Sequence, residues 1–392
     1  MNLLSPESVA ASSSAALGHT GAYSNLELRR HIISIGNDGL LSPGGTFGTD
    51  RGDVEHIFAK DFSAITRKRQ KKRILLYAHG GLVDENAAVQ RVAEYRAQLL
   101  KAEIYPISFI WHTDFFTSIT NILQDAMRKR KSEGFLDDTK DFMLDRLDDA
   151  LEPVARIAGK PIWSEMKGNA LAASSNEGGG ARIVIDCLNK LPQDVEIHLV
   201  GHSAGALFHA PLVEMLAQKG RSIKTCTLWA PACTVKMFKQ SYLPSIENGK
   251  IGRFALYTLN DKAEQDDNCA RIYNKSLLYL ISNALEKEPH IPLFRDGEPL
   301  LGLEKCIGAD SRLRDLFGGK TVDWVRAPND QKGQPVNYST ARHHTDFDDD
   351  EATVRATLAR MLGMEQVKGD FNFKRTRSSM REKREFLTDQ TS

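Results

Sequence analysis

The regular alternation of apolar strands and amphipathic helices that begins at residue 74 restricts the fold of this chain strongly. Continuous apolar runs alternate with segments in which apolar side chains recur at helical spacing. The expected strands are residues 74–80, 104–111, 195–201, 225–232 and 252–260, and the expected helices are residues 85–103, 178–191, 205–220 and 351–364. Strands this apolar are typical of a mostly parallel sheet covered by helices on both faces. The sequence therefore predicts an α/β fold with ligands at the carboxyl ends of the strands.

One long segment, residues 112–180, interrupts this alternation where a single helix would suffice. It carries two apolar stripes at helical spacing, Phe115, Phe116, Ile119, Ile122 and Leu123 in the first, and Leu144, Leu147, Leu151 and Val154 in the second. Long loops without secondary structure are uncommon in compact domains, so we expect an inserted helical cap. Both stripes are expected to be packing faces, and the alternative is that some of their aromatic side chains line a substrate pocket.

The ends of the chain differ from its centre. Residues 1–25 are rich in Ser and Ala and lack the basic and apolar regions of a signal peptide, and residues 366–392 are polar and charged. We expect both to be loosely held tails around a single α/β domain over residues 26–365. Within that domain, residues 29–48 contain a strand-like piece, a turn at Asn37-Asp38-Gly39 and a glycine-rich loop, which predicts a short β-hairpin or meander.

The charge balance argues against a nucleic-acid or membrane partner. The chain has 52 basic and 51 acidic side chains, so no overall field would attract a polyanion. The basic run at 67–73 is interpreted as the solvated entry to a buried strand rather than as a nucleic-acid patch. No stretch approaches 18 consecutive apolar residues, so we expect no membrane span. The even charge is compatible with a homodimer.

The five cysteines show no metal-binding spacing and are odd in number. We interpret them as reduced and mostly buried thiols, which favours a cytoplasmic protein. They are Cys187, Cys226, Cys233, Cys269 and Cys306.

Residues 201–205 read Gly-His-Ser-Ala-Gly and fit the pattern G-x-S-x-G. Such a short pattern is weak alone, but here an apolar strand precedes it and an expected helix follows it, as a nucleophile elbow requires. A side chain at position 201 or 205 would crowd the sharp turn. The helix N-terminus beneath Ser203 also favours negative charge nearby. We therefore expect that Ser203 is a nucleophile and that the turn serves to present it.

A nucleophilic serine needs a base and an orienting acid. Asp261 is the favoured acid because it is the first carboxylate after the strand at 252–260 and lies at its carboxyl end. A helix N-cap is the alternative role for Asp261. The competing acids are Glu264, Asp266 and Asp267.

The candidate bases are two adjacent histidines, His343 and His344, which stand before the helix at 351–364 and complete the order serine, acid, histidine. An oxyanion hole needs converging backbone N–H groups. Ala204 supplies one, and the loop of residues 79–82, His-Gly-Gly-Leu, supplies the other. A simple glycine turn is the alternative reading of that loop.

In these motifs the chain resembles the α/β-hydrolase superfamily, over residues 70 to 365. The carriers of the resemblance are HGGL at 79–82, GHSAG at 201–205, LND at 259–261 and HHTDFDDD at 343–350. The last resembles the H-G-x-F-D-x-D form of the family's histidine loop. This resemblance implies a triad of Ser203, Asp261 and His344, with oxyanion donors at Gly81 and Ala204, or at Leu82 in place of Gly81. The loop is more acidic than usual in the family, which leaves His343 as an alternative base.

The expected activity is that of a carboxylesterase without cofactor or metal, acting on a small-molecule ester through an acyl-enzyme. Thioesterase, amidase, peptidase and acyltransferase reactions use the same machinery, and a non-catalytic interaction protein of this fold is a further alternative. The acidic residues 346–351 are interpreted as caps of the following helix rather than as metal ligands.

Overall fold

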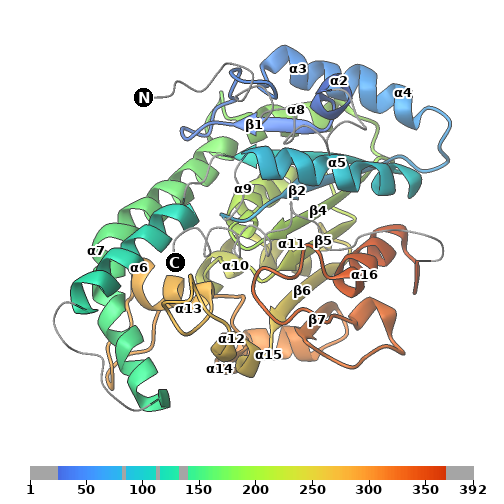
Figure 1. Ribbon diagram of the computed structural model, residues 1–392. Helices are drawn as coiled ribbons and strands as arrows, with labels where there is room; N and C mark the ends of the chain where they lie inside the picture. Colours follow the sequence, from blue (N-terminus) through green and yellow to red (C-terminus); the bar gives the residue numbers. More distant parts are fainter. Residues whose placement is uncertain (1–24, 82–84, 112–114, 132–139, 368–392) are drawn as a thin grey trace, which may run out of the picture.

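Seven parallel strands form one sheet in the part of the chain that the computed structural model describes, residues 25–81, 85–111, 115–131 and 140–367 (Figure 1). Their order in the sheet is β1-β3-β2-β4-β5-β6-β7. The strands are β1 (Ile32–Ile35), β2 (Arg73–Ala78), β3 (Ile104–Trp111), β4 (Glu196–His202), β5 (Thr225–Trp229), β6 (Phe254–Leu259) and β7 (Val322–Ala327). The predicted α/β architecture with a parallel sheet is therefore confirmed.

Helices cover both faces of this sheet. On one face, α5 and α16 pack over side chains such as Tyr77 of β2 and Trp229 of β5. On the other, Phe208 of α9 lies 4.8 Å from Phe109 of β3 between ring centroids, and α8, α10 and α11 pack beside α9. The covering helices are α5 (Glu85–Lys101), α8 (Gly180–Lys190), α9 (Gly205–Gln218), α10 (Val235–Ser241), α11 (Leu243–Glu247) and α16 (Glu351–Leu362).

The first strand corrects one expectation. Residues 29–48 do contain a tight turn, in which Gly36 N donates to Leu40 O at 2.9 Å. The predicted hairpin is present only as a short antiparallel bridge between Ile35 and Leu41, whereas β1 pairs along its length in parallel with β3 at the edge of the main sheet. The helix α2 (Asn25–Arg29) precedes β1, and α3 (Arg51–His56), η1 (Ile57–Asp61) and α4 (Phe62–Thr66) follow it. Of these helices, α3 packs against α8 and α4 packs against β3.

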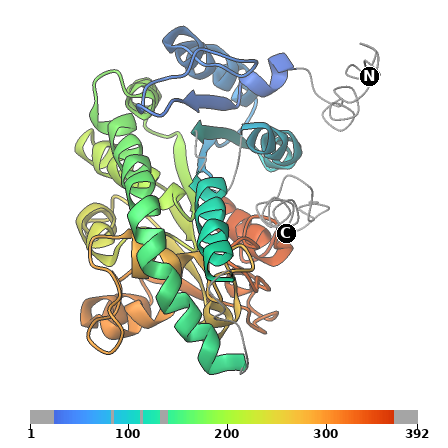
Figure 2. The same ribbon diagram turned by 60° about the vertical axis from the view of Figure 1, so that its left-hand side comes forward.

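The described part of the long insertion is helical. It consists of α6 (Phe115–Lys131) and α7 (Lys140–Ser175), which run alongside each other in Figure 2. The helix α7 also packs against α9 and against η2 (Ile281–Leu285). The two predicted packing stripes are partly buried: Phe115, Ile119, Leu123 and Leu151 are buried, Ile122 and Leu147 are half-buried, and Val154 is exposed. The side chains of Phe116 and Leu144 lie outside the described part.

The remaining elements follow β6. They are α12 (Asp261–Asp266), α13 (Leu277–Leu280), η2 (Ile281–Leu285), α14 (Glu304–Ala309), α15 (Ser311–Gly318) and η3 (Pro335–Asn337). The expected tails fall almost entirely in residues 1–24 and 368–392, which lie outside the described residues. None of the described helices combines the length and the apolar character needed to cross a membrane.

Two further expectations concern side chains. The basic run at 67–73 leads into β2, and there Arg73 is buried and forms an ion pair with Glu196, with 2.9 Å between Nε and Oε2. All five cysteines are free thiols, and every one except the half-buried Cys306 is buried. Burial raises the pKa of Cys233 to about 12, which keeps this thiol protonated.

Candidate functional site

The predicted site lies where the strand order changes direction. The strand β2 has β3 as its neighbour on one side and β4 as its neighbour on the other. At the ends of β2 and β4, Ala78 lies opposite Gly201. In open parallel sheets, ligands bind outside the carboxyl ends of the strands at such a point. The loop that begins at His79 and the turn at Ser203 both leave the sheet there.

Ser203 occupies a strained turn between β4 and α9. Its φ of 53° is in the left-handed region, which non-glycine residues seldom adopt. Two backbone hydrogen bonds hold it there: Ser203 N donates to Trp229 O at 2.9 Å, and Ser203 O accepts from Ala232 N at 3.0 Å. The neighbouring strand β5 and the loop after it therefore fix the angle at which the serine leaves the sheet.

Both glycines of the motif lie in close backbone contacts, and the contact at Gly205 excludes any side chain. A Cβ at position 205 would lie 2.1 Å from the Ala78 carbonyl oxygen, and a Cβ at position 201 would lie 3.0 Å from the carbonyl group of Gly205. The start of α9 is thus pressed against the end of β2. This contact brings the N-terminus of α9, with Ala204 as its N-cap residue, next to the His79–Gly81 loop.

Ser203 and His344 are hydrogen-bonded to each other. The Ser203 Oγ lies 2.9 Å from Nε2 of His344, and both residues are almost fully buried. His344 comes from the loop between η3 and α16, 141 residues away in the sequence. Of the two candidate histidines, it is therefore His344 whose ring the structure places on the serine.

The carboxylate beside the histidines is Asp267, which follows α12. Its Oδ2 accepts from the backbone N of His344 at 2.9 Å, and its Oδ1 accepts from Nδ1 of His343 at 2.9 Å. Asp267 is 2% exposed, so the charge is shielded from water. The neighbouring Asn268 N also donates to Oδ1, at 2.8 Å.

Asp261 lies at the start of α12 and is engaged elsewhere. Its Oδ1 accepts from Lys305 N at 3.0 Å, and its own backbone N donates to Glu304 Oε2 at 2.7 Å. Partial burial and the nearby charge of Glu304 raise the pKa of Asp261. The N-cap of α12 is Asn260, whose side chain accepts from Ala263 N.

Two more acids were candidates. Asp266 is exposed at the end of α12. Glu264 is fully buried, and burial together with the charges of Asp267 and Asp261 raises its pKa to about 8, although the Ser276 hydroxyl offsets part of this effect. Glu264 is therefore neutral at pH 7.

The His79–Gly81 loop is anchored to the end of β3. Trp111 N donates to Nε2 of His79 at 3.4 Å, the Trp111 indole N–H donates to His79 O at 3.2 Å, and the other ring nitrogen of His79 donates to Gly80 O at 2.8 Å. Gly81 is buried at the end of this loop, and Leu82 lies outside the described residues.

The inserted helices lie over this loop. A Cβ on Gly81 would be 3.3 Å from the Phe115 ring of α6 and 3.5 Å from the Met166 sulfur of α7. Next to Met166 in the sequence, Lys167 Nζ lies 2.7 Å from both carboxylate oxygens of Glu286, and the Trp163 indole N–H donates to Glu286 Oε1 at 2.7 Å. Glu286 thus fastens α7 to the segment after η2.

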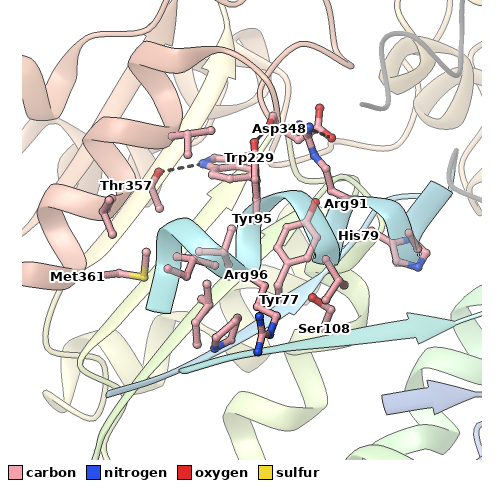
Figure 3. Close-up of a pocket in the computed structure, with 18 of the residues that line it drawn as sticks. Tyr77, His79, Arg91, Tyr95, Arg96, Ser108, Trp229, Asp348, Thr357 and Met361 are labelled. Carbon is pink, nitrogen blue, oxygen red and sulfur yellow. Dashed lines mark hydrogen bonds and ion pairs between the residues drawn. The ribbon is translucent and has the colours of Figure 1, made fainter. Parts of the chain in front are cut away.

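A cavity of about 50 Å³ lies below the site, between α5, α16 and the sheet (Figure 3). At one end of it the Arg91 guanidinium pairs with the Asp348 carboxylate, with 3.2 Å between Nη2 and Oδ2. Arg91 and the Tyr95 hydroxyl also donate to the Asp348 backbone carbonyl. The walls of the cavity are mostly apolar, and they join α5 to the loop that carries His344.

Two carboxylates of the acidic run after His344 accept hydrogen bonds from backbone N–H groups. Asp350 is the N-cap of α16 and accepts from Thr353 N at 3.0 Å. Asp346 Oδ2 accepts from the backbone N atoms of Arg342 and His343, each at 2.9 Å. Among the described residues, metal-ligand separations occur instead at Asp149, Glu152 and His290, whose ligand atoms lie within 4.8 Å of one another.

The sequence did not mark His202 or Arg91 as parts of the site, and it favoured Asp261 over Asp267. His202 is the variable residue of the GHSAG motif, and its Nε2 lies 2.9 Å from the His344 carbonyl oxygen. Asp267 was considered only as a competitor of Asp261. No signal in the sequence marks Arg91, because a basic residue on a helix is ordinarily solvated.

Comparison of the chain with models of protein families, with curated proteins and with solved structures finds no match.

Proposed function

We propose that this protein is a serine hydrolase with the α/β-hydrolase fold that cleaves carboxylic esters, with Ser203 as its nucleophile. The observation that carries the proposal is the hydrogen bond between Ser203 Oγ and Nε2 of the buried His344, at a strained strand-to-helix turn. A serine in this conformation is costly unless the surrounding structure maintains it, and such strain concentrates at functional sites. A hydroxyl hydrogen-bonded to an imidazole is the arrangement that activates a serine.

The proposed reaction proceeds in two transfers of the acyl group. His344 Nε2 takes the hydroxyl proton as Ser203 Oγ attacks the ester carbonyl, which forms a tetrahedral oxyanion. As the bond to the alcohol breaks, His344 gives that proton to the departing oxygen and leaves an acyl-enzyme. A water molecule, deprotonated by His344, then attacks the acyl group, and the acid is released as Ser203 recovers its proton.

Backbone N–H groups stabilise the oxyanion in this proposal. Ala204 contributes the N–H that follows the nucleophile, and the first residues of α9 add the positive end of its dipole. The second N–H comes from Gly81 or Leu82. The anchoring of His79 by Trp111 supports a rigid loop there, since both polar groups of Trp111 engage it.

We assign the role of the acid to Asp267 in preference to Asp261. Asp267 is the buried carboxylate that is hydrogen-bonded to the backbone of His344 and to the ring of His343. Its charge close to His344 would stabilise the imidazolium that forms during the reaction. Asp261 remains the alternative because it follows β6 directly.

The helices α6 and α7 form the cap in this proposal. Phe115 and Met166 lie close to Gly81, so they would contact an acyl group bound at the oxyanion hole. Both side chains are apolar and buried, which favours an apolar acyl group.

The test is covalent labelling followed by kinetics. A fluorophosphonate should label the purified protein once, with the adduct mapped to Ser203 by peptide mass spectrometry, and aryl esters of graded acyl length should be hydrolysed. Ser203→Ala should abolish labelling and lower kcat by at least about 10³-fold. The adjacent histidines provide a matched pair: His344→Ala should lose activity to a similar degree, and His343→Ala much less. Full activity in Ser203→Ala would refute the assignment.

A further inference from the structure

We propose that His202 is a positioning residue that holds the base His344 in register with Ser203. This inference rests on the proposed function, because it concerns how the same site is assembled. His202 lies beside the nucleophile in the GHSAG motif, and its Nε2 lies 2.9 Å from the backbone carbonyl oxygen of His344. A single turn thus presents the serine and also holds the loop that supplies its base.

The direction of this hydrogen bond follows from its acceptor. A carbonyl oxygen only accepts, so Nε2 of His202 must carry the proton. His202 is fully buried, and burial, together with the charges of Arg91 and His79, lowers its pKa to about 4. The imidazole is therefore neutral near pH 7, in the tautomer with its proton on Nε2. Its Nδ1 has no hydrogen-bond partner among the described residues, so this ring is anchored through Nε2.

Aromatic side chains fix the orientation of the His202 ring. It meets the Trp229 ring edge-on at 6.1 Å and 77°, and the Phe347 ring at 6.2 Å and 83°. Phe347 is fully buried and belongs to the same loop as His344. His202 therefore contacts this loop at three points, the His344 carbonyl, the His344 ring at 5.7 Å between centroids, and the Phe347 ring.

The backbone of His344 is held from both sides. Asp267 Oδ2 accepts from its N–H at 2.9 Å, while His202 donates to its carbonyl oxygen at 2.9 Å. With both polar groups of one residue engaged, the backbone of His344 has little freedom to rotate. The imidazole is then held within hydrogen-bond distance of Ser203 as it gains and loses its proton.

Loss of such positioning has a measurable cost. A displacement of about 1 Å in a reacting group can lower the rate about 10²-fold. His202→Leu keeps most of the side-chain volume but removes the donor, and His202→Gln places an amide N–H near the position of Nε2. The matched control is His198→Leu on the same strand, because His198 is equally buried and its Nδ1 lies 2.8 Å from the Thr225 hydroxyl.

The experiment compares these three variants with the wild-type protein. We expect His202→Leu to lower kcat on an aryl ester about 10²-fold with KM within about twofold, and to slow fluorophosphonate labelling of Ser203 by the same factor. His202→Gln should restore most of the loss, and His198→Leu should lower the melting temperature without the loss in kcat. Equal kcat values for His202→Leu and His198→Leu, or a glutamine variant as slow as the leucine variant, would overturn the proposal.

A second measurement does not depend on catalysis. Hydrogen–deuterium exchange of residues 342–350 should be faster in His202→Leu than in the wild-type protein or in His198→Leu, because the loop loses its contact with β4. Unchanged exchange there would overturn the positioning role. A wild-type protein that neither hydrolyses esters nor forms a Ser203 adduct would instead refute the proposed function, and the exchange data would still decide whether His202 holds the loop.

Discussion

Asp267 is hydrogen-bonded to both neighbouring histidines, accepting from the His343 ring through Oδ1 and from the His344 backbone through Oδ2, each at 2.9 Å. One buried carboxylate thus fixes the loop that carries the proposed base. Asp261, six residues earlier, instead accepts from Lys305 at the start of α14.

This difference predicts unequal effects of two matched substitutions. Asp267→Asn removes the negative charge near His344 and replaces one acceptor oxygen by an amide donor, so kcat should fall about 10²- to 10⁴-fold. Asp261→Asn should cause a smaller loss. Ester hydrolysis by the two variants, measured beside their thermal unfolding, checks the prediction, and a larger loss for Asp261→Asn would return the role of the acid to Asp261.

The sequence predicted a strand well where the side chains of that strand are all buried, and poorly where they are not. Both ends of the strand at 104–111 were predicted correctly. All eight side chains of β3 are buried, and the apolar run begins and ends where the strand does. The strand β7 was missed, since it lies at the sheet edge and only three of its six side chains are buried. The local antiparallel bridge between Ile35 and Leu41 was predicted, but the pairing of β1 with β3 was not, because Ile32 and its partner Ser108 are 76 residues apart, beyond any local pattern.

The sequence also predicted some parts of the candidate site and not others. The motif around Ser203 indicated a strand-to-helix turn, and this is where the structure has one. The sequence could not decide between Asp261 and Asp267, because the choice depends on how the short helix α12 directs the chain after β6. His202 was not recognised, since its contact with His344 joins residues 142 positions apart.

The buried Glu264 should make the stability of the protein depend on pH. Burial raises its pKa in the folded state to about 8, so the folded protein keeps a proton that the unfolded chain releases near its ordinary pKa of 4.5. The stability from this group is fully present below about pH 4.5 and is lost as the pH rises through about 8. The loss is on the order of a few kcal/mol.

The measurement is urea unfolding at pH 5 and at pH 8.5. Glu264→Gln carries no charge at either pH, so its free energy of unfolding should fall less between the two than that of the wild-type protein. Asp266→Asn, an exposed acid at the end of the same helix, serves as the control and should follow the wild-type dependence. Parallel pH profiles for the wild type and Glu264→Gln would contradict the prediction.

Glu286 should control how firmly α7 covers the Gly81 loop. It is almost fully buried and accepts from the Trp163 indole and from the Lys167 ammonium, each at 2.7 Å. In Glu286→Gln the ammonium loses its charged partner, and the free energy of unfolding should fall by about 1–3 kcal/mol. Met166 adjoins Lys167 and lies near Gly81. We therefore also expect that the ratio of two rates, Ser203 labelling by a bulky phosphonate over labelling by a small one, is higher in Glu286→Gln than in the wild-type protein.

Urea unfolding and the two labelling rates test this contact directly. Glu288→Gln is the matched control, because Glu288 is an exposed residue that pairs with Arg295 at 2.7 Å. Exposed pairs contribute about 0–1 kcal/mol, so this control should change neither quantity much. An unchanged ratio of labelling rates in Glu286→Gln would show that α7 does not limit access to Ser203.

Two glycine substitutions should have opposite effects on stability. A Cβ at Gly205 would lie 2.1 Å from the Ala78 carbonyl oxygen, so Gly205→Ala forces α9 away from β2. We expect a loss of at least about 2 kcal/mol and a large fall in kcat, because Ser203 moves with the helix. Gly168 lies within α7, and a Cβ there meets no atom within 4 Å. Gly168→Ala should therefore stabilise the protein by about 0.5–1 kcal/mol. If Gly205→Ala unfolds at the wild-type urea concentration and keeps its kcat, the close contact between α9 and β2 does not shape the turn at Ser203.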